Sequence, residues 1–182
     1  NKGREVVIYN YEEQKKRYFE RLKTLSKANR ESIQKFYNQV LSRKKDATQV
    51  KYFVKLFILE GNLKKDFDKV KKEDIEKLVE ILKKKYSENT TGDLVIILKR
   101  FFQWLKNSPK NTYPNEVNWI EGFNSKHSNH INPEDLITEV DIKKMLDVAE
   151  HPRDKAFIMT LFESGCRISE ILQLQIKNIN FD

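Results

Sequence analysis

The chain has 182 residues, of which 38% are hydrophobic and 34% charged, and its formal net charge is +8. This hydrophobic content suffices for a folded core in one or two domains. A single cysteine excludes a disulfide framework, and no apolar run approaches the ~20 residues of a membrane span. We therefore expect a reducing, intracellular setting without a signal peptide. Because the first residue is Asn rather than Met, we also expect a piece of a longer chain.

The positive charge is concentrated in the first part of the chain. Residues 1–110 hold 28 lysines and arginines against 15 aspartates and glutamates, a net charge of +13. Residues 111–182 hold 7 against 12, a net charge of −5. The asymmetry indicates two regions with different roles and a polyanionic partner for the first. The alternative is a lysine-rich surface that is merely solvated.

Residues 1–25 are predicted to form an N-terminal helical arm. The run from Val6 to Tyr9 suits a short strand or an unpaired arm, and Asn10 with Glu13 has the spacing of a helix-capping box. Lys15 alone interrupts the apolar face that follows, which consists of Tyr11, Tyr18, Phe19, Leu22 and Leu25. The pattern favours packing against another element over an arm that reaches DNA or a neighbouring protomer.

Residues 26–108 are predicted to form a bundle of four helices. Each segment has apolar residues at helical spacing, and no segment between them has strand periodicity. Asp46 with Gln49 has the spacing of a second capping box, and Gly61-Asn62 suits a helix end. The expected helices cover residues 29–44, 46–62, 72–86 and 87–106.

Residues 109–134 are predicted to be a linker, because prolines and polar residues replace the periodicity. Within it, Trp119 and Ile120 should anchor a short turn by packing rather than by base stacking. In residues 135–182, Thr138 with Asp141 forms a capping box and Pro152 begins the next helix, which closes at Gly165. A last helix is expected from Ser169 to Gln173. Ile176, Ile179 and Phe181 then indicate the beginning of a strand.

Several polar residues of the basic region have side chains suited to nucleic acid. Lysines are dense over residues 64–85 and match a phosphate backbone without reading sequence. Donors and acceptors on an exposed helix face could read base edges. The alternative is that the polar residues are helix caps and the lysines are solvated. The candidates are Thr48, Gln49, Lys51, Tyr52 and Lys55 in one helix, and Asn89, Thr90, Thr91 and Arg100 in another.

No metal or nucleotide site is expected. His127, His130 and Cys166 are scattered and lack the spacing of zinc ligands. The chain has only five glycines, and none of them cluster into a phosphate-binding loop.

Two stretches resemble a known family. Arg153-Asp154-Lys155-Ala156 and the run from Glu163 to Leu174, with its Gly-x-Arg-x-Ser-Glu-x-Leu pattern, are similar to the opening of the catalytic domain of tyrosine recombinases, the phage integrases and Xer-like enzymes. The upstream helices resemble the family's core-binding domain. The resemblance covers residues 29–182. It implies a mainly α protein, with a four-helix SAM-like core-binding bundle followed by the first helices of a truncated α/β catalytic domain over residues 135–182.

The resemblance implies roles for two residues. Arg167 would be the first of the family's two active-site arginines and would bind the scissile phosphate. Glu170 would support it by orienting the site. A guanidinium remains charged and offers a planar fork to two phosphate oxygens, which suits a pentavalent phosphorus transition state. The structural alternative is that Arg167 simply pairs with Glu163 or Glu170 at helical spacing.

The resemblance further implies a parent enzyme that cuts and rejoins double-stranded DNA through a 3′-phosphotyrosine, without a cofactor or obligatory metal. Four protomers would assemble on paired sites, in the cytoplasm and on the nucleoid of a prokaryote, virus or mobile element. The family's lysine, His-x-x-Arg helix, further His or Trp, and nucleophilic tyrosine would all lie after Asp182. We therefore expect the chain to bind DNA without cutting it. The alternatives are a stand-alone helical DNA-binding or regulatory protein and a helical protein–protein interaction module.

Overall fold

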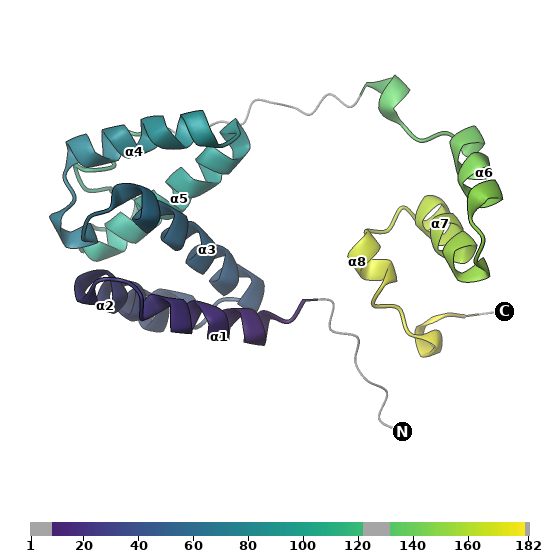
Figure 1. The fold of residues 1–182 in the computed structure, drawn as a ribbon, viewed down its shortest axis with the longest axis horizontal. Coiled ribbons are helices and arrows are strands. Elements are labelled where there is room, and N and C mark those ends of the chain that lie inside the picture. Colours follow the sequence, from purple (N-terminus) through teal and green to yellow (C-terminus); the bar gives the residue numbers. More distant parts are fainter. Residues whose placement is uncertain (1–8, 122–131, 181–182) are drawn as a thin grey trace. The chain divides into compact units, whose positions relative to one another are not determined.

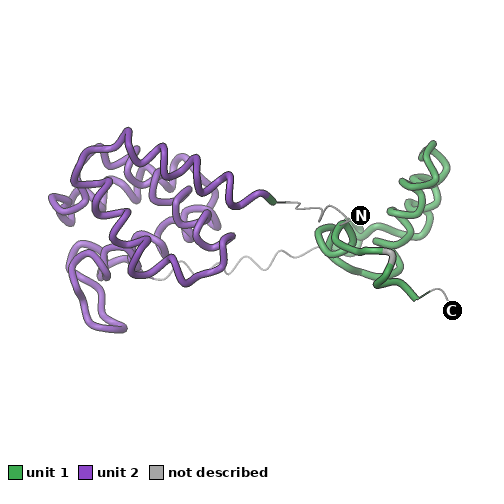
Figure 2. The backbone as a smooth tube through the Cα atoms, turned by 90° about the horizontal axis from the view of Figure 1, so that it is seen from below, with its two compact units in different colours: residues 1–9, 129–182 green, residues 10–128 purple. Residues whose placement is uncertain are grey.

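The computed structural model describes residues 9–121 and 132–180, and all regular elements within these ranges are helical (Figure 1). The chain divides into two compact units (Figure 2). Residues 10–128 form the first, here called the N-terminal unit, and residues 129–182 with residues 1–9 form the C-terminal unit. The mainly α prediction is confirmed. The predicted strand or arm at Val6 to Ile8 lies outside the described residues.

The N-terminal unit contains five α-helices among its described residues. A π-helical turn, Tyr37–Leu41, continues α2, and a 3-10 turn, Phe67–Lys69, precedes α4. One helix was expected over residues 29–44, and the π-helical turn lies within it: there the amide of Ser42 donates to the carbonyl of Tyr37, five residues earlier. The α-helices are α1 (Tyr11–Leu22), α2 (Lys27–Phe36), α3 (Asp46–Leu63), α4 (Lys72–Lys85) and α5 (Glu88–Leu105).

Helix α3 lies at the centre of the N-terminal unit and contacts α1, α4 and α5. It therefore buries apolar residues on more than one side, including Leu56 and Leu59, which a single amphipathic stripe does not predict. Around Phe53 lies an aromatic cluster. The Phe53 ring stacks on those of Tyr18 and Tyr37, with ring centroids 5.7 and 5.4 Å apart. It packs edge to face with the Phe19 ring, at a centroid distance of 5.3 Å.

Truncation of Phe53 should be the most damaging single change to this core. Phe53 is completely buried and joins α1, the π-helical turn and α3. We expect Phe53→Ala to lower the free energy of unfolding by about 3–5 kcal/mol, because it leaves a cavity that three rings cannot fill. Urea denaturation followed by circular dichroism would measure this. Ile81→Ala, at an exposed position of α4, is the control, and an equal loss in both variants would contradict the assignment.

Helix α1 is held to the unit by a charged contact inside an apolar face. The predicted N-cap is confirmed, since the amide of Glu13 donates to Asn10 Oδ1 at 3.1 Å; the Glu13 carboxylate, however, accepts from Asn10 Nδ2 rather than from the Asn10 backbone amide. Lys15 is the one charged residue in the predicted apolar face of this helix. Its Nζ donates to Asp46 Oδ1 at 2.8 Å and to Glu12 Oε1 at 2.9 Å. These two carboxylates raise the pKa of Lys15.

The second predicted capping box, Asp46 with Gln49, is wrong. Lys45 occupies the N-cap position of α3 without a side-chain bond, and Asp46 is the first helical residue. The Asp46 carboxylate pairs with Lys15 instead. Gln49 Nε2 turns back to the carbonyl of Lys44 at 2.7 Å. The Asp46 side chain, which the local sequence pattern assigned to the N-cap of α3, thus forms a tertiary ion pair with Lys15 instead.

The segment that follows α5 packs on the N-terminal unit as far as Ile120. Val117 and Ile120 are buried and Trp119 packs against the core, which confirms the predicted anchoring turn. Two side chains of α5 hold this segment by its backbone. Lys99 Nζ donates to the carbonyl of Ile120 at 2.7 Å, and Gln103 Nε2 donates to those of Pro109 and Thr112 at 3.0 and 2.8 Å.

The C-terminal unit consists of three short α-helices and two 3-10 turns among its described residues. The capping box of Thr138 and Asp141, the start at Pro152 and the end at Gly165 are all confirmed. The predicted strand is wrong for the described residues, since residues 176–178 form a 3-10 turn; Phe181 lies outside them. The elements are η3 (Pro133–Asp135), α6 (Glu139–Val148), α7 (Pro152–Ser164), α8 (Ile168–Ile171) and η4 (Ile176–Asn178).

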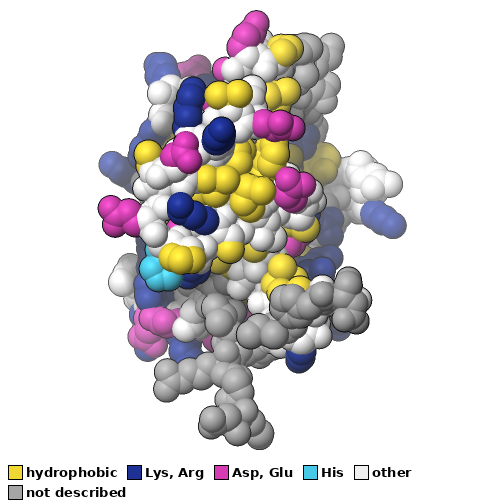
Figure 3. All heavy atoms as spheres, turned by 90° about the vertical axis from the view of Figure 1, so that its right-hand side faces the viewer, with side chains coloured by type: hydrophobic (Ala, Val, Ile, Leu, Met, Phe, Trp, Pro, Cys, Tyr) yellow, Lys and Arg dark blue, Asp and Glu magenta, His cyan; other side chains and the backbone are white. Residues whose placement is uncertain are grey.

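The C-terminal unit leaves most of its large apolar side chains exposed. Among the side chains of this unit whose burial the structure describes, Ile142 is the one buried hydrophobic residue. Apolar side chains gather on the face of this unit shown in Figure 3. The exposed large apolar side chains of this unit, on whichever side they lie, include Leu136, Ile137, Val140, Met145, Val148, Met159, Phe162, Ile168, Leu172, Leu174 and Ile179. Three short helices with one buried anchor make a weaker core than that of the N-terminal unit.

Candidate nucleic-acid interface

The corner between α7 and α8 presents Arg167 to solvent. Helix α7 ends at Gly165, whose φ of 61° lies in the left-handed region that favours glycine, and the Gly165 amide donates to the carbonyl of Leu161 at 3.1 Å. A Cβ added there would meet no atom within 4 Å, so the backbone conformation rather than lack of space requires glycine. The chain then reverses through Cys166 and begins α8 after Arg167.

Glu170 holds Arg167 at two points. The backbone amide of Arg167 donates to Glu170 Oε2 at 2.8 Å, and its guanidinium Nη1 donates to Oε1 at 3.1 Å. The Arg167 side chain is nevertheless 83% exposed. The structural alternative, an ion pair with Glu170, is therefore present, but it uses one side of the guanidinium fork. The remaining donors are accessible to an oxyanion, as a phosphate-binding arginine requires.

The Arg167–Glu170 contact should respond to acid. The Arg167 amide, and then its guanidinium, hold the pKa of Glu170 below its ordinary value of 4.5. A carboxyl with a lowered pKa keeps its contacts above that ordinary value and loses them as the pH falls through the lowered one. We expect the contact to be intact at pH 5 and above and to open only below about pH 4.5. Carboxyl-carbon NMR of Glu170 would measure this, and Arg167→Ala should raise the pKa. A Glu170 pKa that is the same in both proteins would contradict the contact.

Cys166 lies beside this corner and is exposed. Its backbone amide donates to Ser164 Oγ at 3.2 Å. In the described part of the chain, no three His, Cys, Asp or Glu side chains are grouped to hold a metal ion. His127 and His130, which were considered with Cys166 as zinc ligands and lack the spacing for it, lie outside that part.

The second candidate surface is formed by the solvent-facing sides of α3 and α5, and is called here the α3–α5 face. Lys51 Nζ of α3 meets the Asp93 carboxylate of α5 at 3.1 Å. Burial raises the pKa of Tyr52, while the nearby charges of Arg100 and Lys51 act in the opposite direction. Three residues that the sequence proposed from two separate helices, Lys51, Tyr52 and Arg100, are therefore brought together.

Two of the predicted contact residues are not available on this surface. Gln49 is 4% exposed and accepts a hydrogen bond from the Tyr37 hydroxyl at 3.1 Å. Thr91 is buried and its hydroxyl donates to the carbonyl of Leu82 at 3.3 Å. Both side chains therefore form hydrogen bonds inside the bundle, with the Tyr37 hydroxyl and the Leu82 carbonyl respectively. The other candidates, Thr48, Lys55, Asn89 and Thr90, are partly or fully exposed, whereas Asp93 and the exposed Ile96 were missed by sequence reasoning.

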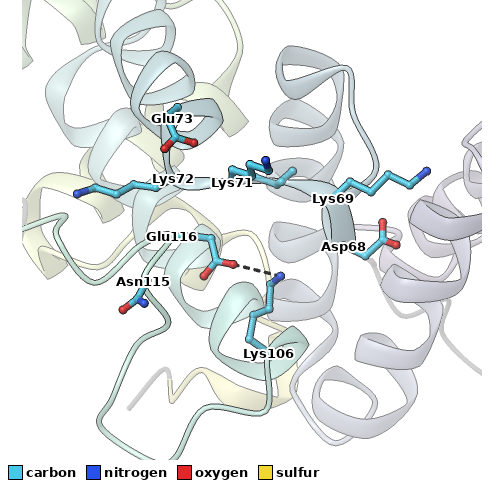
Figure 4. Close-up of a pocket in the computed structure, with 9 residues that line it drawn as sticks. Asp68, Lys69, Lys71, Lys72, Glu73, Lys106, Asn115 and Glu116 are labelled. Carbon is cyan, nitrogen blue, oxygen red and sulfur yellow. Dashed lines mark ion pairs between the residues drawn. The ribbon is translucent and has the colours of Figure 1, made fainter.

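Among the nine lysines of residues 64–85, Lys65, Lys69 and Lys72 pair with acidic side chains. Lys65 meets Asp74 at 2.6 Å and Lys69 meets Asp66 at 2.9 Å. Figure 4 shows a hollow between the start of α4 and the segment after α5, with Lys106 paired to Glu116 at 3.1 Å. The side chains of Lys69 and Lys72 extend in opposite directions, so the lysines of this hollow do not converge on one point. Its geometry does not favour a phosphate site.

Within residues 9–121 and 132–180, no helix is long and apolar enough to cross a bilayer.

Comparison with known proteins shows what the C-terminal part of the chain is similar to. A family model described as the phage integrase family matches residues 135–182, the stretch that contains Arg167 and Glu170. Together with two relatives that carry the name of a tyrosine recombinase, this match supports a distant relationship between the chain and the tyrosine recombinase and integrase family.

Two relatives carry the name tyrosine recombinase XerA. The protein from Pyrococcus horikoshii is 25% identical over 137 residues, and that from Pyrococcus furiosus is 25% identical over 139 residues. Both matches cover 72% of this chain and 41% of the relative, so the chain spans less than half the length of these proteins. No solved structure matches the chain.

Proposed function

We propose that the chain is the DNA-binding and phosphate-positioning part of a site-specific tyrosine recombinase. The observation that carries this proposal is Arg167: its guanidinium is exposed, is oriented by Glu170, and lies in the segment that matches the integrase family. In this proposal, residues 26–108 are the core-binding domain, residues 135–182 begin the catalytic domain, and residues 1–25 and 109–134 are the arm and the linker.

In the proposed reaction, a tyrosine hydroxyl attacks the scissile phosphorus and forms a 3′-phosphotyrosine, while the 5′-oxygen leaves. Arg167 would bind the phosphate oxygens whose negative charge grows in the transition state, and Glu170 would keep the guanidinium aligned. The last tyrosine of this sequence is Tyr113, which precedes Arg167, and we do not assign it as the nucleophile. We therefore expect this chain by itself to bind duplex DNA without cleaving it.

The α3–α5 face supports the DNA-binding half of the proposal. Lys55 and Arg100 supply positive charge, Arg100 near the partly buried Tyr52, and Asn89 and Thr90 lie at the start of α5. Cations position a phosphate backbone, whereas neutral polar groups can read base edges. We further propose that the complete enzyme self-associates on DNA as a tetramer and acts at the nucleoid of a prokaryotic, viral or mobile-element host.

A salt titration tests the proposed function against a helical interaction module whose basic surface is only solvated. With two phosphate contacts, from Lys55 and Arg100, affinity for duplex DNA should fall about tenfold between 50 and 200 mM salt. Fluorescence anisotropy of a labelled duplex would measure it. Absence of binding at the lowest salt would reject DNA binding. Conversion of DNA to a covalent protein adduct by this chain alone would reject the expected lack of cleavage.

A further inference from the structure

Ile96 departs from the pattern of the helix that carries it. Its side chain is 60% exposed, more than any other large hydrophobic side chain in the described part of the N-terminal unit. Its neighbours Val95 and Ile97 are both 2% exposed. The bundle core therefore makes little use of Ile96, although an isoleucine at an exposed helix position has lower helix propensity than lysine or glutamate.

The surroundings of Ile96 on α5 are polar and charged. Asn89, Asp93, Ile96 and Arg100 follow one another at spacings of three and four residues, so they share one side of the helix. Asp93 is also the residue that meets Lys51 of α3 at 3.1 Å. Ile96 thus lies on the α3–α5 face, between a charged pair and an arginine.

The charged side chains around Ile96 differ in whether an opposite charge neutralises them. The Lys51–Asp93 pair is locally neutral. Arg100 Nη1 donates to the uncharged Gln103 Oε1 at 2.7 Å, and among the described residues neither Arg100 nor Lys55 has a carboxylate partner. The face therefore combines free cations with a locally neutral region that contains one aliphatic side chain. A duplex groove has a comparable division, with phosphates along its rims and base edges between them.

We propose that Ile96 contacts the C5-methyl group of thymine in the major groove and gives the α3–α5 face a preference for A·T pairs. The inference rests on the proposed function, because it requires this face to bind DNA. Thymine methyl is the apolar group by which the major groove distinguishes A·T from G·C pairs, and aliphatic side chains contact it. Asp93 and Arg100 cannot supply that contact, whereas Ile96 can do so from an already exposed position.

The test compares two duplexes of equal length that differ only in the methyl group. One has alternating adenine and thymine, and the other has alternating adenine and uracil. Anisotropy at constant low salt should show that the chain binds the thymine duplex about three- to fivefold more tightly, the effect expected for one buried methyl. Ile96→Ala should bind both equally, and Ile96→Val should keep most of the preference. Ile81→Ala is the matched control, because Ile81 is an exposed isoleucine on another helix, and it should behave as the original chain does.

The outcomes separate this inference from the proposed function. Equal binding of both duplexes by the original chain would overturn the methyl contact while leaving DNA binding in place. A thymine preference that survives in Ile96→Ala would assign the contact to another residue and also overturn the inference. Failure to bind either duplex would reject the proposed function itself. Circular dichroism of each variant confirms that the helices are retained.

Discussion

Arg167→Ala is expected to lower DNA cleavage by about a hundred- to a thousandfold in a protein that extends over the full length of the relatives. The guanidinium binds charge that is greatest in the transition state, so its loss should affect the rate much more than the affinity for duplex DNA. Arg167→Lys should recover only part of the activity, because an ammonium keeps the charge but loses the planar fork. Duplex affinity should change by less than about twofold in either variant.

A nicked duplex that traps the covalent adduct, resolved on a denaturing gel, would measure this cleavage. Arg153→Ala is the matched control. Arg153 is an exposed arginine of the same unit that pairs with the adjacent Asp154 at 2.8 Å. Its replacement should leave cleavage nearly unchanged. Full cleavage by Arg167→Ala would remove Arg167 from the active site and would leave the Glu170 ion pair as its whole role.

Joint replacement of Lys55 and Arg100 by alanine should weaken duplex binding by this chain about tenfold at moderate salt. Each lost phosphate contact also removes a released counterion, so the salt dependence should become shallower by nearly two units on a log–log plot. The double variant Lys16→Ala with Lys27→Ala changes the net charge equally at exposed positions of α1 and α2. Anisotropy over a range of salt would compare them. Equal losses in both double variants would mean that overall charge, rather than the α3–α5 face, controls binding.

Most helix limits followed from signals within a few residues. Asn10 with Glu13, Thr138 with Asp141, and Gly165 at the end of α7 all act locally, and all were predicted correctly. The start of α3 at Asp46 was predicted correctly, but the capping role of Asp46 was not, because Lys15, 31 residues away, binds its carboxylate. The strand expected near Ile179 depended on an apolar run alone, whereas a strand is stabilised by pairing with another strand, which a local pattern does not specify.

The candidate site was predictable to different degrees in its two parts. Arg167 and Glu170 lie three residues apart, so their contact could be anticipated from helical spacing and is present. On the α3–α5 face, residue type alone could not separate contact residues from buried ones. Gln49 and Thr91 satisfy internal carbonyl and hydroxyl groups, because α3 and α5 have neighbours on several sides. Ile96 was missed for the opposite reason, since an isoleucine in an apolar helix is expected to be buried.

The position of Cys166 has a practical consequence for experiments on this protein. It is the sole cysteine of the chain, it is exposed, and it directly precedes Arg167. A thiol-reactive fluorophore would therefore attach at one defined place without any engineered substitution. Its emission would report the arrival of a nucleic acid at the α7–α8 corner independently of events at the α3–α5 face, so the two surfaces could be followed separately in a single titration.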